Sequence, residues 1–312
     1  MYKFIVVKNK SIFYLLLIFL MLLFLVPLSY SLYNSKDSFQ STNSNISTNE
    51  DISLDFNGDG ETETLQISIK EDTYVINIKN SSNNYILQPN SDSKIFGDHN
   101  SSFPLKVNTL DLSRDGIPEI IISTIKDNKP IFYVFTWNKS DFLNVYTSSN
   151  NILGVLDSKN SRTPKILSIS SSEGDISTNS YIFNGDVLKD ITFSKTTVPN
   201  LNLIQSFIDL IEAPYEISDP PDIFSSLIDS SELRLLWNLN KDTCNYTFQN
   251  GSFHDSSWDD DGNITKLIWC LSFEQTEKLG SSDNKKELLL YLTIEKNSYN
   301  EFKISTIKKH NN

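Results

Sequence analysis

Three stretches of the chain align without a gap and decide the expected fold: LDFNGDGETETLQISI at 54–69, LDLSRDGIPEIIISTI at 110–125 and LDSKNSRTPKILSISS at 156–171. Each copy begins with a polar, turn-forming loop and continues into a β-branched segment. More alternating segments follow each copy, separated by turns rich in Asn, Ser, Asp and Gly. The sequence therefore predicts three successive antiparallel β repeats of three or four strands, with the spacing of propeller blades.

The first two copies place oxygen-bearing side chains at alternate positions of the loop. We number the positions from the Asp that follows the leading Leu, so the first loop is 55–63, the second loop 111–119 and the third loop 157–165. Alternate residues of a curled loop point inward, and Ca²⁺ prefers six to eight oxygen ligands. The predicted ligands occupy positions 1, 3, 5, 7 and 9, with position 7 acting through its carbonyl: Asp55, Asn57, Asp59, Glu61 and Glu63, and Asp111, Ser113, Asp115, Ile117 and Glu119.

The same loop pattern also suggests an EF-hand or a turn without metal. An EF-hand needs a bidentate Glu at position 12, but Gln66 and Ile122 stand there, so an EF-hand is excluded. Asx and Gly residues also dominate ordinary turns, so a metal-free turn remains open. The third loop carries Lys159 and Lys165, whose charges would repel a cation, and it is expected to bind none.

The pattern D-x-[DNS]-x-D-G-x-x-E followed by a strand resembles the FG-GAP/VCBS type of repeat found in integrin-like β-propellers and many bacterial surface proteins. The resemblance covers roughly residues 50–196. It implies structural calcium in the first two loops and blade-like repeats. Closed propellers have four or more blades, so an open β stack or a degenerate extra blade also fits the three copies.

The N-terminal part of the chain predicts contact with a membrane. The apolar run at 12–28 follows Lys3, Lys8 and Lys10. Such a segment is either an uncleaved transmembrane anchor or a signal peptide, here 1–33, and the positive-inside bias places the rest of the chain outside the cytoplasm. Residues 34–50 predict a flexible linker because they lack large apolar side chains. We therefore expect a single-pass cell-membrane protein, or a secreted one if the signal is cleaved.

After the repeat region at 51–198, the residues 199–312 predict an α+β domain. Helical periodicity begins at Leu201, further short helices are expected at 222–229 and 233–239, and four alternating segments follow. This order of elements resembles a nuclear-transport-factor-2-like cone over about 200–309. The predicted fold class is mainly β with a C-terminal α+β domain, in which helices pack on a four-stranded antiparallel sheet.

Several side chains of the C-terminal domain raise chemical questions. Cys244 and Cys270 flank a predicted hairpin and form either a cross-strand disulfide or two buried thiols. The acidic run 259–261 predicts a solvated turn. His254 is expected to be solvent-exposed, with no catalytic motif around it. Six aromatic residues line either a ligand pocket or simply the core: Trp237, Tyr246, Phe248, Trp269, Phe273 and Tyr291.

The negative net charge of the chain disfavours one class of function, the binding of nucleic acid. The formal net charge of -12 argues against a nucleic-acid partner, because such binding draws on clusters of Lys and Arg. Together with the absence of a catalytic motif, this predicts a non-catalytic binding or interaction module with structural Ca²⁺, whose partner is an unknown protein or glycan. The alternative is a cell-envelope enzyme or small-ligand-binding protein that uses a pocket in the C-terminal domain.

Overall fold

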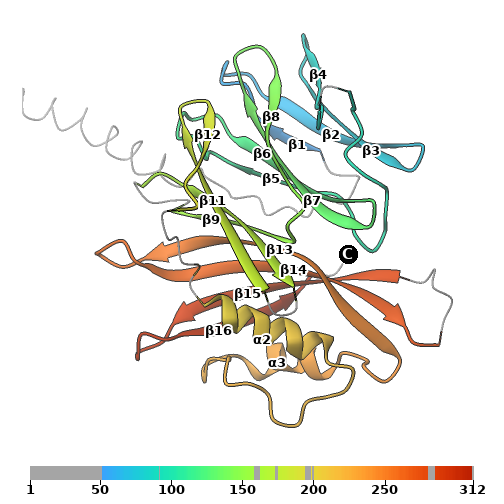
Figure 1. Ribbon diagram of the computed structural model, residues 1–312, viewed down its shortest axis with the longest axis vertical. Coiled ribbons are helices and arrows are strands. Elements are labelled where there is room, and N and C mark those ends of the chain that lie inside the picture. Colours follow the sequence, from blue (N-terminus) through green and yellow to red (C-terminus); the bar gives the residue numbers. More distant parts are fainter. Residues whose placement is uncertain are drawn as a thin grey trace, which may run out of the picture. The chain divides into compact units, whose positions relative to one another are not determined.

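The computed structural model describes residues 51–90, 92–157, 162–172, 175–193, 198, 200–279 and 285–310. These residues are mainly β, as predicted, and most neighbouring strands are antiparallel (Figure 1). Two helices occur among them, α2 (Leu201–Glu212) and α3 (Ser230–Trp237).

Each aligned sequence copy lies in a meander of four antiparallel strands. The first meander comprises β1 (Ile52–Leu54), β2 (Glu63–Lys70), β3 (Thr73–Lys79) and β4 (Asn84–Ile86). The second comprises β5 (Lys106–Leu110), β6 (Glu119–Lys126), β7 (Lys129–Trp137) and β8 (Phe142–Ser148). The third comprises β9 (Ile152–Leu156), β10 (Lys165–Ser172), β11 (Asp175–Asn184) and β12 (Val187–Asp190).

The meanders share one register, which places the three loops equivalently. In each, the leading Leu pairs with the residue at position 9, so the loop joins two paired strand ends: Leu54 with Glu63, Leu110 with Glu119 and Leu156 with Lys165. The β2–β3 and β6–β7 hairpins both turn through two residues with positive φ, as type I′ turns require. These residues are Glu71 and Asp72, and Asp127 and Asn128.

The four alternating segments of the C-terminal region form four strands. They are β13 (Cys244–Trp258), β14 (Ile264–Glu277), β15 (Lys285–Lys296) and β16 (Phe302–Lys309). β13 also pairs in parallel with β9, so the third meander and the C-terminal strands form one eight-stranded sheet, in the order β12-β11-β10-β9-β13-β14-β15-β16. The sheet therefore crosses the predicted boundary between 198 and 199.

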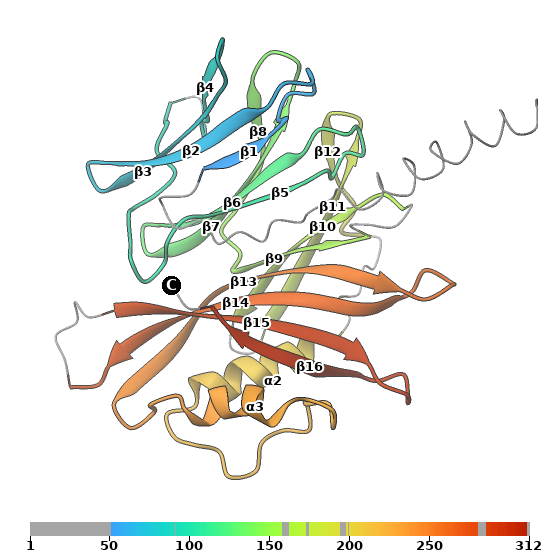
Figure 2. The ribbon, with the colours of Figure 1, turned by 180° about the vertical axis from the view of Figure 1, so that it is seen from behind.

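Both helices lie on one side of the C-terminal strands (Figure 2). The buried side of α2 contributes Ile204, Phe207 and Ile211 to a core that also contains Trp269 of β14. A separate core cluster joins the first and second meanders, and another joins the second and third. The repeats are thus held together by apolar contacts between neighbouring meanders.

One local prediction was wrong, and the structure decides between the two alternatives for the cysteines. The segment 222–229 is not a helix, because Ile223 and Ser225 exchange backbone hydrogen bonds with Ile304 and so extend the edge of β16. Cys244 and Cys270 form no disulfide and are free. They are not opposite each other, since Cys244 pairs with Glu277 and Cys270 with Ser252. The turn of their hairpin lies at 259–263.

The predicted membrane span is also corrected. No helix within the described residues is long and apolar enough to cross a membrane. The longer of the two described helices, α2, has 12 residues, against roughly 20 for a span, and packs into the core. The apolar run at 12–28 lies outside the described residues.

Candidate metal centre in the first and second loops

Backbone amides hold the first loop around the Asp at position 1. The Asp55 Oδ1 atom accepts a hydrogen bond from Gly58 N at 2.7 Å, and Oδ2 accepts one from Gly60 N at 2.9 Å. Both glycines have positive φ, 76° and 87°, which residues with a Cβ rarely adopt. Asp59 Oδ1 accepts from Glu61 N at 2.7 Å. The loop is therefore curled as the sequence predicted.

Glu63 closes the first loop from the start of β2. Its side chain is fully buried, and its Oε2 atom accepts from Phe56 N at 2.9 Å. The Oε1 atom accepts from the amide nitrogens of Asn57 at 3.1 Å and Asn80 at 3.0 Å. Asn57 Nδ2 also donates to Asp59 Oδ2 at 3.0 Å. The fold thus brings together positions 3, 5 and 9.

The second loop repeats these contacts. Asp111 accepts from Arg114 N at 2.7 Å and from Gly116 N at 3.2 Å, and Asp115 accepts from Ile117 N at 2.8 Å. The buried Glu119 accepts through Oε2 from the backbone N of Leu112 at 2.6 Å and of Ser113 at 3.1 Å. Positions 1, 5 and 9 therefore face the same loop groups in both copies.

A supporting residue in each meander was missed by sequence reasoning. Asn80 Nδ2 donates to Glu63 Oε1, and the Thr136 hydroxyl donates to Glu119 Oε1 at 3.2 Å, in both cases from a residue 17 positions further along the chain. Asn80 follows β3 and Thr136 lies in β7, next to the strand that the Glu begins. The constant separation of 17 was the only signal, and it has meaning only once the strand pairing is known.

The glutamates that close the two loops, Glu63 and Glu119, are both buried. Burial raises the pKa of Glu119 to about 7, against an ordinary 4.5, and the hydrogen bonds from Leu112 and Ser113 offset only part of this effect. The Ser113 Oγ atom faces this carboxylate but makes no hydrogen bond of normal geometry. Among the described residues, no ion pair involves Glu63 or Glu119. Their negative charge is therefore not balanced by a basic side chain.

The donor set fits a hard cation in part. The predicted ligand side chains offer carboxylate or hydroxyl oxygens, or an amide that can turn its oxygen toward the cation, and Ca²⁺ prefers oxygen ligands. Within the part of the chain that the structure describes, no three His, Cys, Asp or Glu side chains gather closely enough to hold a metal by themselves. A cation would thus also need Asn57 or Ser113 and the carbonyls of Glu61 or Ile117. Asn57 would have to turn its amide so that Oδ1 replaces Nδ2.

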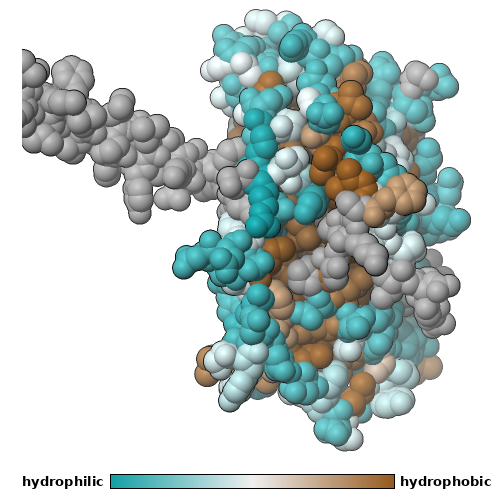
Figure 3. Space-filling model, turned by 60° about the vertical axis from the view of Figure 1, so that its left-hand side comes forward, coloured by the Kyte–Doolittle hydropathy of each residue, from teal (hydrophilic) through white to brown (hydrophobic). Residues whose placement is uncertain are grey.

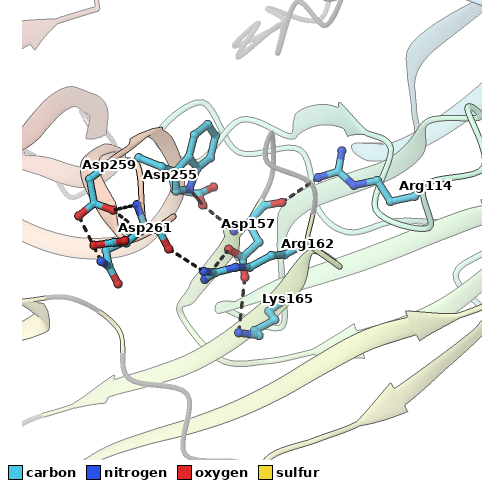
Figure 4. A network of polar contacts seen from close by, with 9 residues as sticks. Arg114, Asp157, Arg162, Lys165, Asp255, Asp259 and Asp261 are labelled. Carbon is cyan, nitrogen blue, oxygen red and sulfur yellow. Dashed lines mark hydrogen bonds and ion pairs between the residues drawn. The ribbon is translucent and has the colours of Figure 1, made fainter.

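The third loop contains side-chain cations instead. Lys165, at position 9, places its Nζ atom 3.4 Å from Asp157 Oδ2, and Arg162 Nη1 lies 3.9 Å from Asp157 Oδ1 (Figure 4). Asp157 is nevertheless buried, and it adopts a positive φ of 61°. The carboxylate that corresponds to Asp55 and Asp111 is thus neutralised by the chain's own basic groups.

The acidic run 259–261, His254 and Asp255 lie in or beside strand β13. Asp259 Oδ1 accepts from the amides of Asp261 and Asn263, which confirms the acidic run as a turn. His254 lies within β13 and is half-buried, not exposed at a turn as predicted. Its neighbour Asp255 is fully buried and accepts from Trp258 Nε1 at 2.9 Å.

Two of the six aromatic residues lie fully buried in the core. Trp269 and Phe273 are fully buried, and Trp269 stacks on Phe253 with 4.2 Å between ring centroids. The space beside Trp237 measures about 10 Å³, which is at most the size of one water molecule. An open groove of about 670 Å³ lies between the start of α2 and the β15–β16 turn, where Lys303 pairs with Asp222 at 3.0 Å.

Comparisons with known proteins do not assign the chain to a family. No model of a protein family matches the chain, and no curated protein matches it. The expected resemblances to FG-GAP/VCBS repeats and to a nuclear-transport-factor-2-like cone are not tested by these comparisons. The case for calcium consequently stands on the geometry and charge of the two loops alone.

Proposed function

We propose that this protein is a non-catalytic interaction module whose first and second meanders are stiffened by Ca²⁺ in the first and second loops. One observation carries the proposal: in two loops, 56 residues apart, a buried Glu at position 9 accepts a hydrogen bond from the backbone N of position 2. A turn alone needs Asx and Gly residues but does not need a buried carboxylate.

The charge of each loop explains what a cation would contribute. The first and second loops both hold carboxylates at positions 1, 5 and 9, the first also has Glu61 at position 7, and the carboxylate at position 9 is buried in both. Burying an unpaired charge is costly, and like charges repel at short range. A divalent cation would remove both costs and tie the end of one strand to the start of the next. Under this proposal each meander is a blade-like unit closed at one loop.

The interaction partner is proposed to be a protein or a glycan. The strongly acidic chain disfavours nucleic acid. One face of the molecule exposes apolar side chains between hydrophilic ones (Figure 3), and large exposed apolar residues include Val187, Tyr215 and Leu227. Contiguous apolar surface marks sites where proteins bind other molecules, whereas apolar residues exposed singly do not. Ca²⁺ would act structurally, by making the surface of the meanders rigid.

Removing the carboxylates at position 5 tests the proposal. For the full chain, calcium at about 100 times its Kd is expected to add about 2.7 kcal/mol of stability per site, measured as a rise in melting temperature over the chelated protein. Asp59→Ala combined with Asp115→Ala should abolish this rise and the heat signal of a calorimetric calcium titration.

The matched control is Asp186→Ala combined with Asp260→Ala, which changes the net charge equally at exposed turn positions outside the loops. This control should respond to calcium as the wild type does. Equal melting temperatures of the wild type in calcium and in chelator would contradict calcium binding. A loss of response in both double variants would attribute the effect to overall charge.

A further inference from the structure

Asp157 contacts groups from three different parts of the fold (Figure 4). Its backbone N donates to Asp255 Oδ2 of β13 at 2.5 Å. Its backbone carbonyl accepts from Arg114 Nη2 of the second loop at 2.8 Å. Its carboxylate faces Lys165 and Arg162 of the third meander. We call these five residues the Asp157 network.

Arg114 belongs to the candidate cation site as well as to this network. It occupies position 4 of the second loop, where its backbone N donates to Asp111 Oδ1 at 2.7 Å and its φ is 65°. The direction of its side chain therefore depends on the curled conformation of the loop. Whatever orders that conformation also positions the guanidinium group against the Asp157 carbonyl.

The other end of the network reaches the turn between β13 and β14. Arg162 Nη2 donates to the carbonyl of Asp261 at 3.2 Å. It also packs against Gly262, where an added Cβ would lie 2.8 Å from Nη2. Asp255 accepts from both Asp157 N and Trp258 Nε1, and Trp258 ends β13. The turn is thus fastened to Asp157 by Arg162 on one side and by Asp255 on the other.

We infer that the Asp157 network couples cation binding in the second loop to the ordering of the β13–β14 turn. The inference rests on the proposed function, because it requires a divalent cation at the second loop. The coupling is expected to be positive: the bound cation fixes position 4, Arg114 then holds Asp157, and Asp157 holds the turn through Asp255 and Arg162. Asp157 serves as the connector, and Arg162 and Lys165 neutralise its carboxylate in place of a metal.

Amide hydrogen exchange of the full chain, with and without CaCl₂, tests this coupling. In the wild type, calcium should slow exchange within 111–119 and also at Asp157 and within 259–263. Arg114→Leu should keep the slowing within 111–119 but reduce it at Asp157 and the turn by about fivefold or more, the lower end of typical couplings between sites. Removing a positive charge beside the site should not weaken cation binding.

Arg234→Leu is the matched control, since Arg234 lies in α3 and its side chain donates to Ser230 O. It should behave as the wild type. Calcium-dependent slowing at the turn that is equal in wild type and Arg114→Leu would overturn the coupling while leaving the proposed function intact. Exchange within 111–119 that does not respond to calcium in the wild type would overturn both. Melting curves establish that each variant is folded.

Discussion

Glu119→Gln is expected to stabilise the chelated protein at pH 8 by roughly 3 kcal/mol, because it removes a buried negative charge. The Gln amide can keep the existing contacts. Its oxygen can accept from Leu112 N and Ser113 N, as Glu119 Oε2 does in the wild type. Its nitrogen can donate to Thr136 Oγ1, which in the wild type donates to Glu119 Oε1. The measurement is the free energy of unfolding by denaturant, with chelator present, from pH 4 to pH 8.

The sign of the pH dependence follows from the direction of the pKa change. Burial raises the folded-state pKa of Glu119 to about 7, above its ordinary 4.5. The stabilising contribution of the protonated form is therefore fully present below about pH 4.5 and is lost as the pH rises through 7. The wild type should lose roughly 3 kcal/mol over this window from this group, whereas the variant should not.

Glu63→Gln provides the contrasting variant. Glu63 Oε1 accepts from two amide nitrogens, of Asn57 and Asn80, while Oε2 accepts from Phe56 N. A Gln at this position must direct its own NH₂ group at one of these donors, so a cost of about 1–3 kcal/mol is expected. If Glu119→Gln were destabilising at pH 8 to the same extent, ionised Glu119 would be a favourable partner of its loop.

Calcium should largely cancel the difference in stability between the wild type and Glu119→Gln at pH 8. A bound cation favours the carboxylate, so saturating calcium should stabilise the wild type more than Glu119→Gln. The same unfolding experiment in calcium therefore separates a burial effect from a cation site. An equal gain in both proteins would show that Glu119 is not a ligand.

Gly154→Ala is expected to destabilise the protein by about 3 kcal/mol, the upper end of costs for overpacking a core. An added Cβ would lie 2.0–2.5 Å from three ring carbons of Phe253, which is paired with Gly154 across the parallel β9–β13 ladder. The Phe253 ring cannot move freely because it stacks on the buried Trp269. Equilibrium denaturation measures the loss.

A second substitution shows whether the clash is the cause. Phe253→Ala should be strongly destabilising alone, but Gly154→Ala should cost much less in that background, because the obstructing ring is gone. Gly251→Ala is the control within β13, where the nearest atom to an added Cβ is the end of the Leu271 side chain at 3.0 Å. A small effect of Gly154→Ala in the wild-type background would contradict the parallel pairing that makes the eight-stranded sheet.

Much of the two loops could be predicted because their signals are local. Positive φ at glycine, inward-facing Asx residues and a Glu that returns to its own loop all arise within nine residues. Contacts with a neighbouring strand could not be predicted from the sequence. Examples are the hydrogen bonds that Asn80 and Thr136 donate to the glutamates at position 9. The segment 222–229 was misassigned because its backbone pairing with Ile304 outweighs its helical pattern.

The amino-acid sequence by itself determined the three repeats, their common register and the residues that curl each loop, since alternation, turn residues and spacing act over short distances along the chain. Only the tertiary structure decided that β9 pairs with β13, that no disulfide joins Cys244 to Cys270 and that Asp157 meets Arg114 and Asp255. These contacts join segments far apart in sequence. Their formation depends on which surfaces pack together, which no local pattern encodes.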